Sequence, residues 1–178
     1  MITGKHIAET AENSGLLGTP YSKLDCQAFV EEVLKLAGLK IINYRGSNHM
    51  WRDLVYDRSP VQKETAANII PGVLVFKVKF DGGEAKRGYH DQMGNAYHVG
   101  INLGDGRVVH STTGGVQYGN TKDWTDYAYI KDVEYGGKDD EGKGSTWLRC
   151  YQIIDDIIKL LKEMEDTLYD LESGTETD

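Results

Sequence analysis

The order of its secondary-structure signals predicts that this chain adopts an α+β fold, with helices first and an antiparallel sheet second. Helical spacing of apolar residues dominates the first third of the sequence, and β-branched strand patterns begin at Pro71–Gly72. The length of 178 residues suits one domain with a short appendage, and it allows a hydrophobic core without disulfide support. With 39% hydrophobic and 27% charged residues, the composition is that of a globular protein.

Charge and hydropathy exclude two classes of partner. The 20 Lys and Arg residues face 28 Asp and Glu residues, a net charge of −8, so we expect no nucleic-acid partner bound through phosphates. No run of 18 apolar residues exists, so we expect no membrane-spanning helix. The polar N-terminus shows no signal peptide, which leaves the location open. Synthesis in the cytoplasm, with delivery by lysis or by a phage particle, fits that N-terminus.

Two helices are predicted before residue 40. Residues 3–14 form the first, with Thr3 as its N-cap. Asp25 is the N-cap of the second, which covers residues 26–37 with helical spacing of its apolar positions and ends at Gly38. A third, short helix is predicted over residues 47–57, and a further turn begins at Pro60.

Strands follow from residue 73 onward. Residues 73–80 are rich in β-branched residues, and 97–103 and 107–112 read as two strands joined by a tight turn at Asp105–Gly106. Further strand patterns lie at 116–119 and 127–135. These segments predict an antiparallel sheet that packs against the helices.

The C-terminal third contains two more predicted elements and a tail. Residues 146–152 read as a closing strand, so the main domain is expected to cover residues 1–152. Residues 153–172 carry an apolar stripe with heptad spacing, which predicts an amphipathic helix. That stripe either packs on the domain itself or forms a homo-oligomer or a contact with a protein partner. The tail, 173–178, is expected to be disordered.

Cys26 is the residue best placed for chemistry. Its position in the first turn after Asp25 puts it among free backbone amides at the positive end of a helix dipole. These groups stabilise a thiolate and can also hold an oxyanion. A cysteine nucleophile needs a base, which is normally a histidine.

Two of the five histidines lie in neighbouring predicted strands, His98 and His110. A hairpin can bring both side chains to one face, although a register slip of one residue would separate them. Together with Cys26 they favour a catalytic triad. The alternatives are two buried structural histidines, or a zinc site built from the same three side chains.

Three segments match a known family in order and spacing. They are GTPYSKLDCQAFVEEVLKLAG, PGVLVF and HVGINLGDGRVVHST. The sequence resembles the NlpC/P60 family of papain-like cysteine peptidases, which hydrolyse bacterial cell walls. The resemblance implies a papain-like fold, with residues 1–152 as the catalytic domain. It also implies a substrate: a peptidoglycan stem peptide, cleaved between D-γ-glutamyl and a diamino acid, without metal or cofactor.

The resemblance also implies a role for each matched residue. Cys26 would be the nucleophile, His98 the general base and His110 the group that orients His98. Tyr21 would lie on the oxyanion side of the nucleophile. Gln27–Ala28 stands where the family usually has Ser-Gly, which keeps open a non-catalytic module of the same fold, such as a phage-tail component, or a related amidase or acyltransferase.

A further segment offers candidate substrate-binding residues. Arg45 and Arg52 could each meet a stem-peptide carboxylate in a bidentate pair, and Trp51 could form the wall of a pocket. The alternative is a loop–helix junction with a buried tryptophan and solvated arginines.

Overall fold

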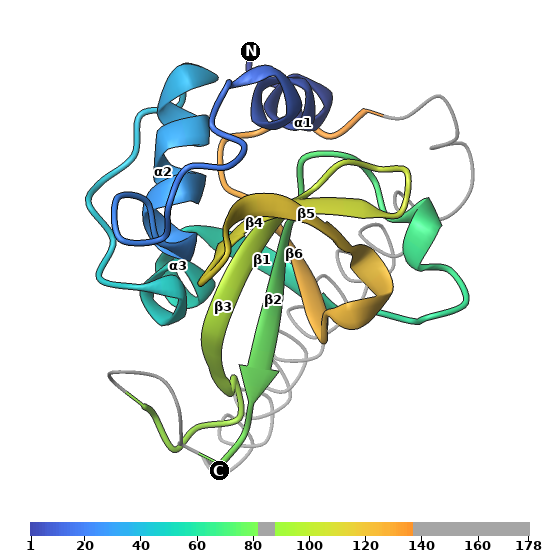
Figure 1. Cartoon of the computed structure of the whole chain (residues 1–178). Helices are drawn as coiled ribbons and strands as arrows, with labels where there is room; N and C mark the ends of the chain where they lie inside the picture. The colour runs from blue at the N-terminus through green and yellow to red at the C-terminus, as the bar shows by residue number, and fades with distance from the viewer. Residues whose placement is uncertain (82–87, 137–178) are drawn as a thin grey trace, which may run out of the picture. The chain divides into compact units, whose positions relative to one another are not determined.

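The computed structural model describes residues 1–81 and 88–136. In this part of the chain, three α-helices and six strands follow one another (Figure 1). The helices come first and the sheet is antiparallel throughout, which confirms the predicted α+β class. The predicted strand 146–152, helix 153–172 and tail 173–178 lie outside the described residues.

The first two helices begin at their predicted caps. Helix α1 covers Gly4–Asn13, and the Thr3 side chain accepts a hydrogen bond from the His6 N–H. Helix α2 covers Cys26–Leu36, and the Asp25 side chain accepts one from the Ala28 N–H. Each cap satisfies a backbone donor that has no partner inside the helix.

The six strands form one sheet in the order β1-β6-β2-β3-β4-β5. Their bounds are Val55–Pro60, Leu74–Lys79, Asn95–Asn102, Arg107–Thr112, Gly115–Asn120 and Asp126–Ile130 for β1 to β6. The predicted hairpin of β3 and β4 is therefore confirmed. The strand expected over 127–135 ends earlier, at Ile130.

The prediction of a helix through residue 57 is wrong. Helix α3 covers only Ser47–Asp53, and the chain turns into β1 at Val55. Strand β1 pairs with β6, more than 60 residues later in the chain. This distant partner supplies the hydrogen bonds that decide between helix and strand, so the local pattern did not indicate the change.

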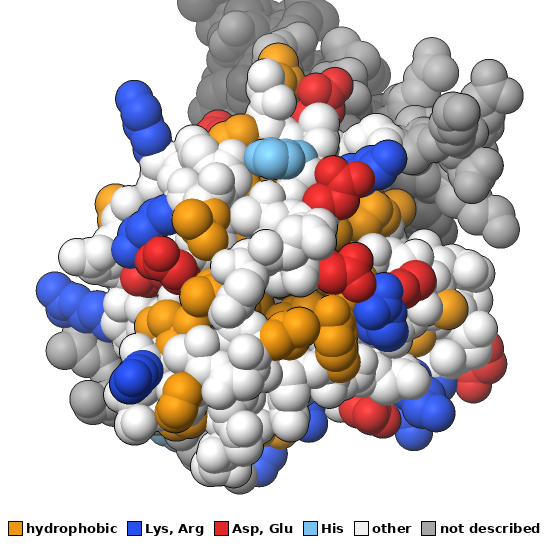
Figure 2. All heavy atoms as spheres, turned by 45° about the horizontal axis from the view of Figure 1, so that its top comes forward, with side chains coloured by type: hydrophobic (Ala, Val, Ile, Leu, Met, Phe, Trp, Pro, Cys, Tyr) orange, Lys and Arg blue, Asp and Glu red, His pale blue; other side chains and the backbone are white. Residues whose placement is uncertain are grey.

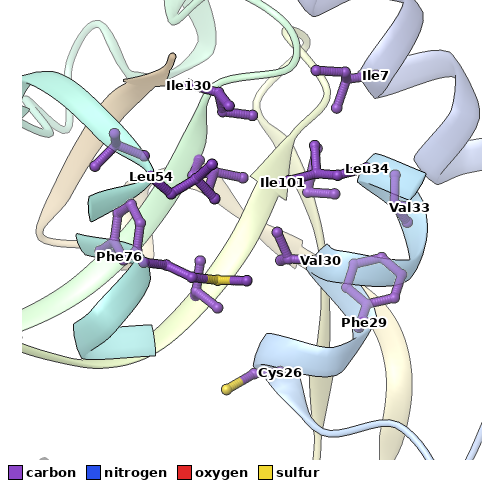
Figure 3. Close-up of a cluster of buried hydrophobic side chains, with 14 of the residues drawn as sticks. Ile7, Cys26, Phe29, Val30, Val33, Leu34, Leu54, Phe76, Ile101 and Ile130 are labelled. Carbon is purple, nitrogen blue, oxygen red and sulfur yellow. The ribbon is translucent and has the colours of Figure 1, made fainter. Parts of the chain in front are cut away.

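The main core lies between the helices and one face of the sheet. Figure 1 shows α2 and α3 on the same side of the sheet, next to β3. Fully buried side chains from both layers fill the space between them, among them Phe29, Val30, Leu34, Phe76 and Ile101 (Figure 3). The opposite face carries a smaller buried cluster of Val75, Val108 and Trp124.

The start of β2 touches the start of α1 through two glycines. A Cβ atom on Gly72 would lie 1.9 Å from the carbonyl oxygen of Gly4, and Gly72 has a φ of +81°. The Gly72 N–H also donates to the Asn102 carbonyl at 2.8 Å. This contact fixes where the first helix crosses the sheet, and it leaves no space for a side chain at residue 72.

Charged side chains of both signs are interspersed on the face drawn in Figure 2, with hydrophobic side chains between them in small groups. Several of the charges near α1 are paired, such as Lys5 with Glu9 and Arg107 with Glu12. Within residues 1–81 and 88–136, the structure contains no helix that is both long and apolar enough to cross a membrane.

Candidate active site

Cys26 is the first residue of α2 and lies at the edge of the main core. Its side chain is buried, with 7% of the residue exposed, and Asp25 caps the helix just before it at 2.8 Å from the Ala28 nitrogen. Figure 3 shows its sulfur directed away from Phe29 and Val30, beyond the end of the buried cluster. The thiol therefore lies where the first free amides of the helix are found.

The sheet opens beside Cys26. Strands β3 and β4 pair only at Ile101↔Val109 and Asn102↔Val108, so the ladder has ended before it reaches Val99 and Ser111. Here the Ser111 hydroxyl donates to the carbonyl of Leu24, and Val99 lies in the same buried cluster as Cys26. The turn before Cys26 is thus joined to β4 by a side-chain hydrogen bond.

His98 and His110 meet across this opening. Nε2 of His98 lies 2.8 Å from Nδ1 of His110, a hydrogen-bond distance. This contact occupies Nε2 of His98 and does not involve Nδ1 of the same ring. His98 immediately precedes Val99, which lies in the same buried cluster as Cys26, and the register that the sequence left open brings the two histidine rings together.

Trp124 holds both imidazole rings. Its ring stacks on His98 with centroids 5.1 Å apart and planes 9° apart, and it meets His110 edge-on at 5.2 Å. The sequence indicated only a core or rim aromatic at this position. Stacking restricts the rotation of the His98 ring, so Trp124 acts as a positioning residue.

Tyr21 also belongs to this group of side chains. Tyr21 lies close enough to Cys26 for each side chain to affect the pKa of the other, while 38% of the residue is exposed to solvent. Burial raises the pKa of Tyr21, and the neighbouring Cys26 and Asp25 add to the rise. The hydroxyl therefore stays protonated and can donate a hydrogen bond near the thiol.

Burial sets the protonation of the cysteine. It raises the pKa of the Cys26 thiol, and Asp25 adds to the rise, whereas the Val99 N–H and the Tyr21 hydroxyl act in the opposite direction. The sequence led us to expect a thiolate stabilised by the helix N-terminus. In the structure the desolvation penalty outweighs these donors, so the resting form is the neutral thiol.

The two histidines are neutral as well. Burial, followed by the charges of His110 and Lys77, lowers the pKa of His98 to about 4. Burial and Lys77 also lower the pKa of His110. Near pH 7 the site therefore contains a thiol and two uncharged imidazoles, with Lys77 as a permanent cation beside them.

Two of the three candidate substrate-binding residues, Trp51 and Arg52, make contacts within the protein. The Arg52 guanidinium is held by both Asp91 oxygens at 2.9 Å, and it also donates to Asn48 and to the Gly94 carbonyl. Trp51 is buried and donates from Nε1 to the Met93 carbonyl. Arg45 is exposed at the start of this region. The contacts of Trp51 and Arg52 anchor the segment before β3, and they do not join these residues to Cys26.

Two other features of the described residues lie apart from this group. A surface hollow of about 220 Å³ beside α1 is lined by Glu12, Asp105 and Arg107, whose charges are paired with one another. Within residues 1–81 and 88–136, no group of three His, Cys, Asp or Glu side chains is placed to hold a metal ion.

Comparisons with known proteins agree with this arrangement. The family model described as "NlpC/P60 family" matches residues 14–133, a segment that contains Tyr21, Cys26, His98 and His110. Among solved structures, the NlpC/P60 domain of the peptidoglycan hydrolase SagA is similar over 72% of this chain and 100% of its own, with 22% identity and a TM-score of 0.50. None of the curated proteins matches the chain. Since the family model covers two thirds of its residues, the chain belongs to the NlpC/P60 family.

Proposed function

We propose that this chain is a cysteine peptidase that hydrolyses the D-γ-glutamyl–diamino acid bond of bacterial peptidoglycan stem peptides. One observation carries the proposal: Cys26 begins α2 in the same buried cluster as Val99, and the residue before Val99, His98, forms a hydrogen-bonded pair with His110. The family membership and the similarity to a domain of a peptidoglycan hydrolase support the cell wall as the substrate.

The first half of the reaction forms an acyl-enzyme. As the Cys26 sulfur attacks the scissile carbonyl carbon, its proton moves to Nδ1 of His98, so the ion pair forms together with the new C–S bond. The His98 Nε2–H donates to Nδ1 of His110, which orients the ring and stabilises the imidazolium. The carbonyl oxygen becomes an oxyanion, which the Cys26 backbone N–H and the Tyr21 hydroxyl can bind.

The second half returns the enzyme to its starting state. The C–N bond breaks, and the leaving amine takes the proton from Nδ1 of His98. Water then donates a proton to the same nitrogen and attacks the thioester carbonyl, after which the thiol recovers its proton and the carboxylic product leaves. The Cys26 thiol and the His98 imidazole are thus both uncharged between turnovers. Their charges are separated only while the reaction takes place.

Replacement of the nucleophile tests this function. With purified stem peptides as substrate, Cys26→Ala should lower the rate of cleavage by about 10³-fold or more, because no covalent intermediate can form. Mass spectrometry of the two product peptides identifies the bond. Cys150→Ser is the matched control and should retain activity. Full cleavage by the Cys26 variant, or none by the wild type, would contradict the proposal and favour a non-catalytic module.

A glycine beside His110 offers a finer test of the histidine pair. A Cβ atom on Gly119 would lie 2.8 Å from Nε2 of His110. Gly119→Ala should therefore push the imidazole away from His98 and lower kcat by about tenfold while KM stays nearly constant, since misplacement affects the reacting geometry. Steady-state kinetics on the same stem peptide measure both constants.

The control for this substitution lies in the same hairpin. A Cβ atom on Gly114 would meet the Thr112 and Gln117 side chains at ordinary contact distances of 3.5 and 3.6 Å. Gly114→Ala should keep wild-type kcat and KM. Wild-type kinetics in Gly119→Ala would mean that the precise position of His110 does not matter for the reaction.

A further inference from the structure

We propose that Lys77 forms an anion-binding subsite beside the His98–His110 pair, and that it makes the enzyme prefer substrates with a free carboxylate close to the scissile bond over amidated ones. The preference for such substrates rests on the proposed function. The anion subsite itself is a property of the folded protein and can be tested without a substrate.

The sheet register places Lys77 directly opposite His98. The two residues are paired between β2 and β3, so their side chains share one face of the sheet, about 5 Å apart at Cβ. The Lys77 ammonium lies 5.8 Å from the centre of the Trp124 ring, which stacks on His98 and touches His110 edge-on. Lys77 therefore belongs to the same group of side chains as the histidine pair.

A lysine in this position is unusual for its surroundings. The neighbouring residue on the same face, Val75, is fully buried in the small cluster with Trp124. Lys77 itself is half-buried. Among the residues that the structure describes, no carboxylate lies within the 4.0 Å that defines an ion pair with its ammonium. A half-buried cation without such a partner attracts an anion more strongly than one in open solvent.

Charges on the neighbouring elements do not cancel this cation. His98 and His110 are neutral near pH 7, because burial lowers both of their pKa values. Asp126 on β6 pairs with Phe76, so it belongs to the opposite face of the sheet from Lys77. Asp25 caps α2, where its side chain accepts the Ala28 N–H. Lys77 therefore supplies the local positive charge in a chain of net charge −8.

The chemistry of the proposed substrate provides a matching anion. A γ-linked glutamyl residue is joined through its side-chain carboxyl, which leaves its α-carboxyl group free, a few bonds from the scissile carbonyl. An ammonium binds such a carboxylate by charge and hydrogen bonding, and amidation of the group removes the charge. Lys77 would then distinguish the acid from the amide.

Two alkylating reagents test the subsite without any substrate. Iodoacetate is an anion and iodoacetamide is its neutral counterpart. Both react with the Cys26 thiolate, so the fraction of thiolate cancels when the rate for iodoacetate is divided by the rate for iodoacetamide. This ratio therefore reports the electrostatic potential at Cys26. Mass spectrometry follows Cys26 and Cys150 separately at pH 7.5, and Cys150 serves as the reference in the same chain. Lys77→Met should lower the ratio at Cys26 by about fivefold, because it removes one positive charge.

Lys79 is the matched control. It lies two residues further along the same strand, also over an aromatic ring, with its ammonium 5.2 Å from the centre of Tyr97. Lys79→Met should leave the ratio at Cys26 unchanged, and Lys77→Arg should retain it. An unchanged ratio in Lys77→Met, or an equal loss in Lys79→Met, would overturn the subsite.

A pair of peptides tests the specificity. Stem peptides with a free or an amidated glutamyl α-carboxyl group should differ in kcat/KM by at least fivefold in the wild type, and Lys77→Met should remove that difference through KM. Equal cleavage of both peptides by the wild type overturns the specificity. If neither peptide is cleaved but the alkylation ratio responds to Lys77, the subsite stands and the proposed peptidase function fails.

Discussion

Replacing His98 with glutamine should lower kcat/KM for a stem peptide by about a thousandfold. The amide keeps much of the shape of the ring but offers no nitrogen that can take the Cys26 proton, so the general-base contribution is lost. The neutral site favours such a large effect, because Cys26 rests as a thiol and needs a base for every turnover. The control His6→Gln alters an exposed histidine on α1 and should leave kcat/KM within about twofold.

The pH profile separates loss of the base from loss of the fold. His98 must be neutral to act as a base, and its pKa is lowered to about 4, so wild-type kcat/KM should keep its plateau well below pH 6.5 and fall only near pH 4. The residual activity of the His98→Gln variant should lack this acid limb. An acid limb at pH 6.5 or above in the wild type would show that the His98 ring is solvated or paired differently during catalysis.

Substitution of Gly72 should have the largest effect on stability. A Cβ atom there would lie 1.9 Å from the Gly4 carbonyl oxygen, and neither backbone segment is a flexible side chain that could move aside. The left-handed φ of +81° adds strain for any L-residue. We expect Gly72→Ala to lower the free energy of unfolding by about 4 kcal/mol, which corresponds to a Tm lower by roughly 10 °C. Urea unfolding and a thermal melt measure both quantities.

Gly106 is the matched control for that clash. It has nearly the same backbone conformation, with a φ of +86°, but the closest atom to an added Cβ is the Ala67 Cβ at 3.5 Å. Gly106→Ala should therefore cost only the conformational strain, about 1 kcal/mol. Equal losses in the two variants would mean that the contact between α1 and β2 adds nothing to the strain.

Short-range signals in the sequence predicted the elements that carry the site. The cap at Asp25 located the start of α2, and the turn at Asp105–Gly106 located the hairpin of β3 and β4. Both depend on residues close together in the chain, which is where sequence patterns are most informative. The elements that carry Cys26, His98 and His110 could therefore be predicted before their geometry was known.

Features that depend on distant contacts were not predicted. The sequence of β1 looks like the end of a helix, and only its pairing with β6 makes it a strand. Trp124 looks like an ordinary core residue in the sequence, and only the structure shows that it stacks on His98. The sequence also did not predict that the Cys26 thiol is protonated, because burial opposes the local effect of the helix N-terminus. One signal for Lys77 was present: a cation in the middle of the apolar strand VLVFKVKF.

The turn that carries the nucleophile also protects the sheet. Beside Cys26, strands β3 and β4 have stopped pairing, and each would present free backbone donors and acceptors if nothing lay between them. Unpaired strand edges recruit strands from other molecules and so promote aggregation. The turn before Cys26 lies against β4 at this opening, where its Leu24 carbonyl accepts the Ser111 hydroxyl. Loss of this turn would therefore expose the two strands and lower the solubility of the chain, whatever the role of Cys26.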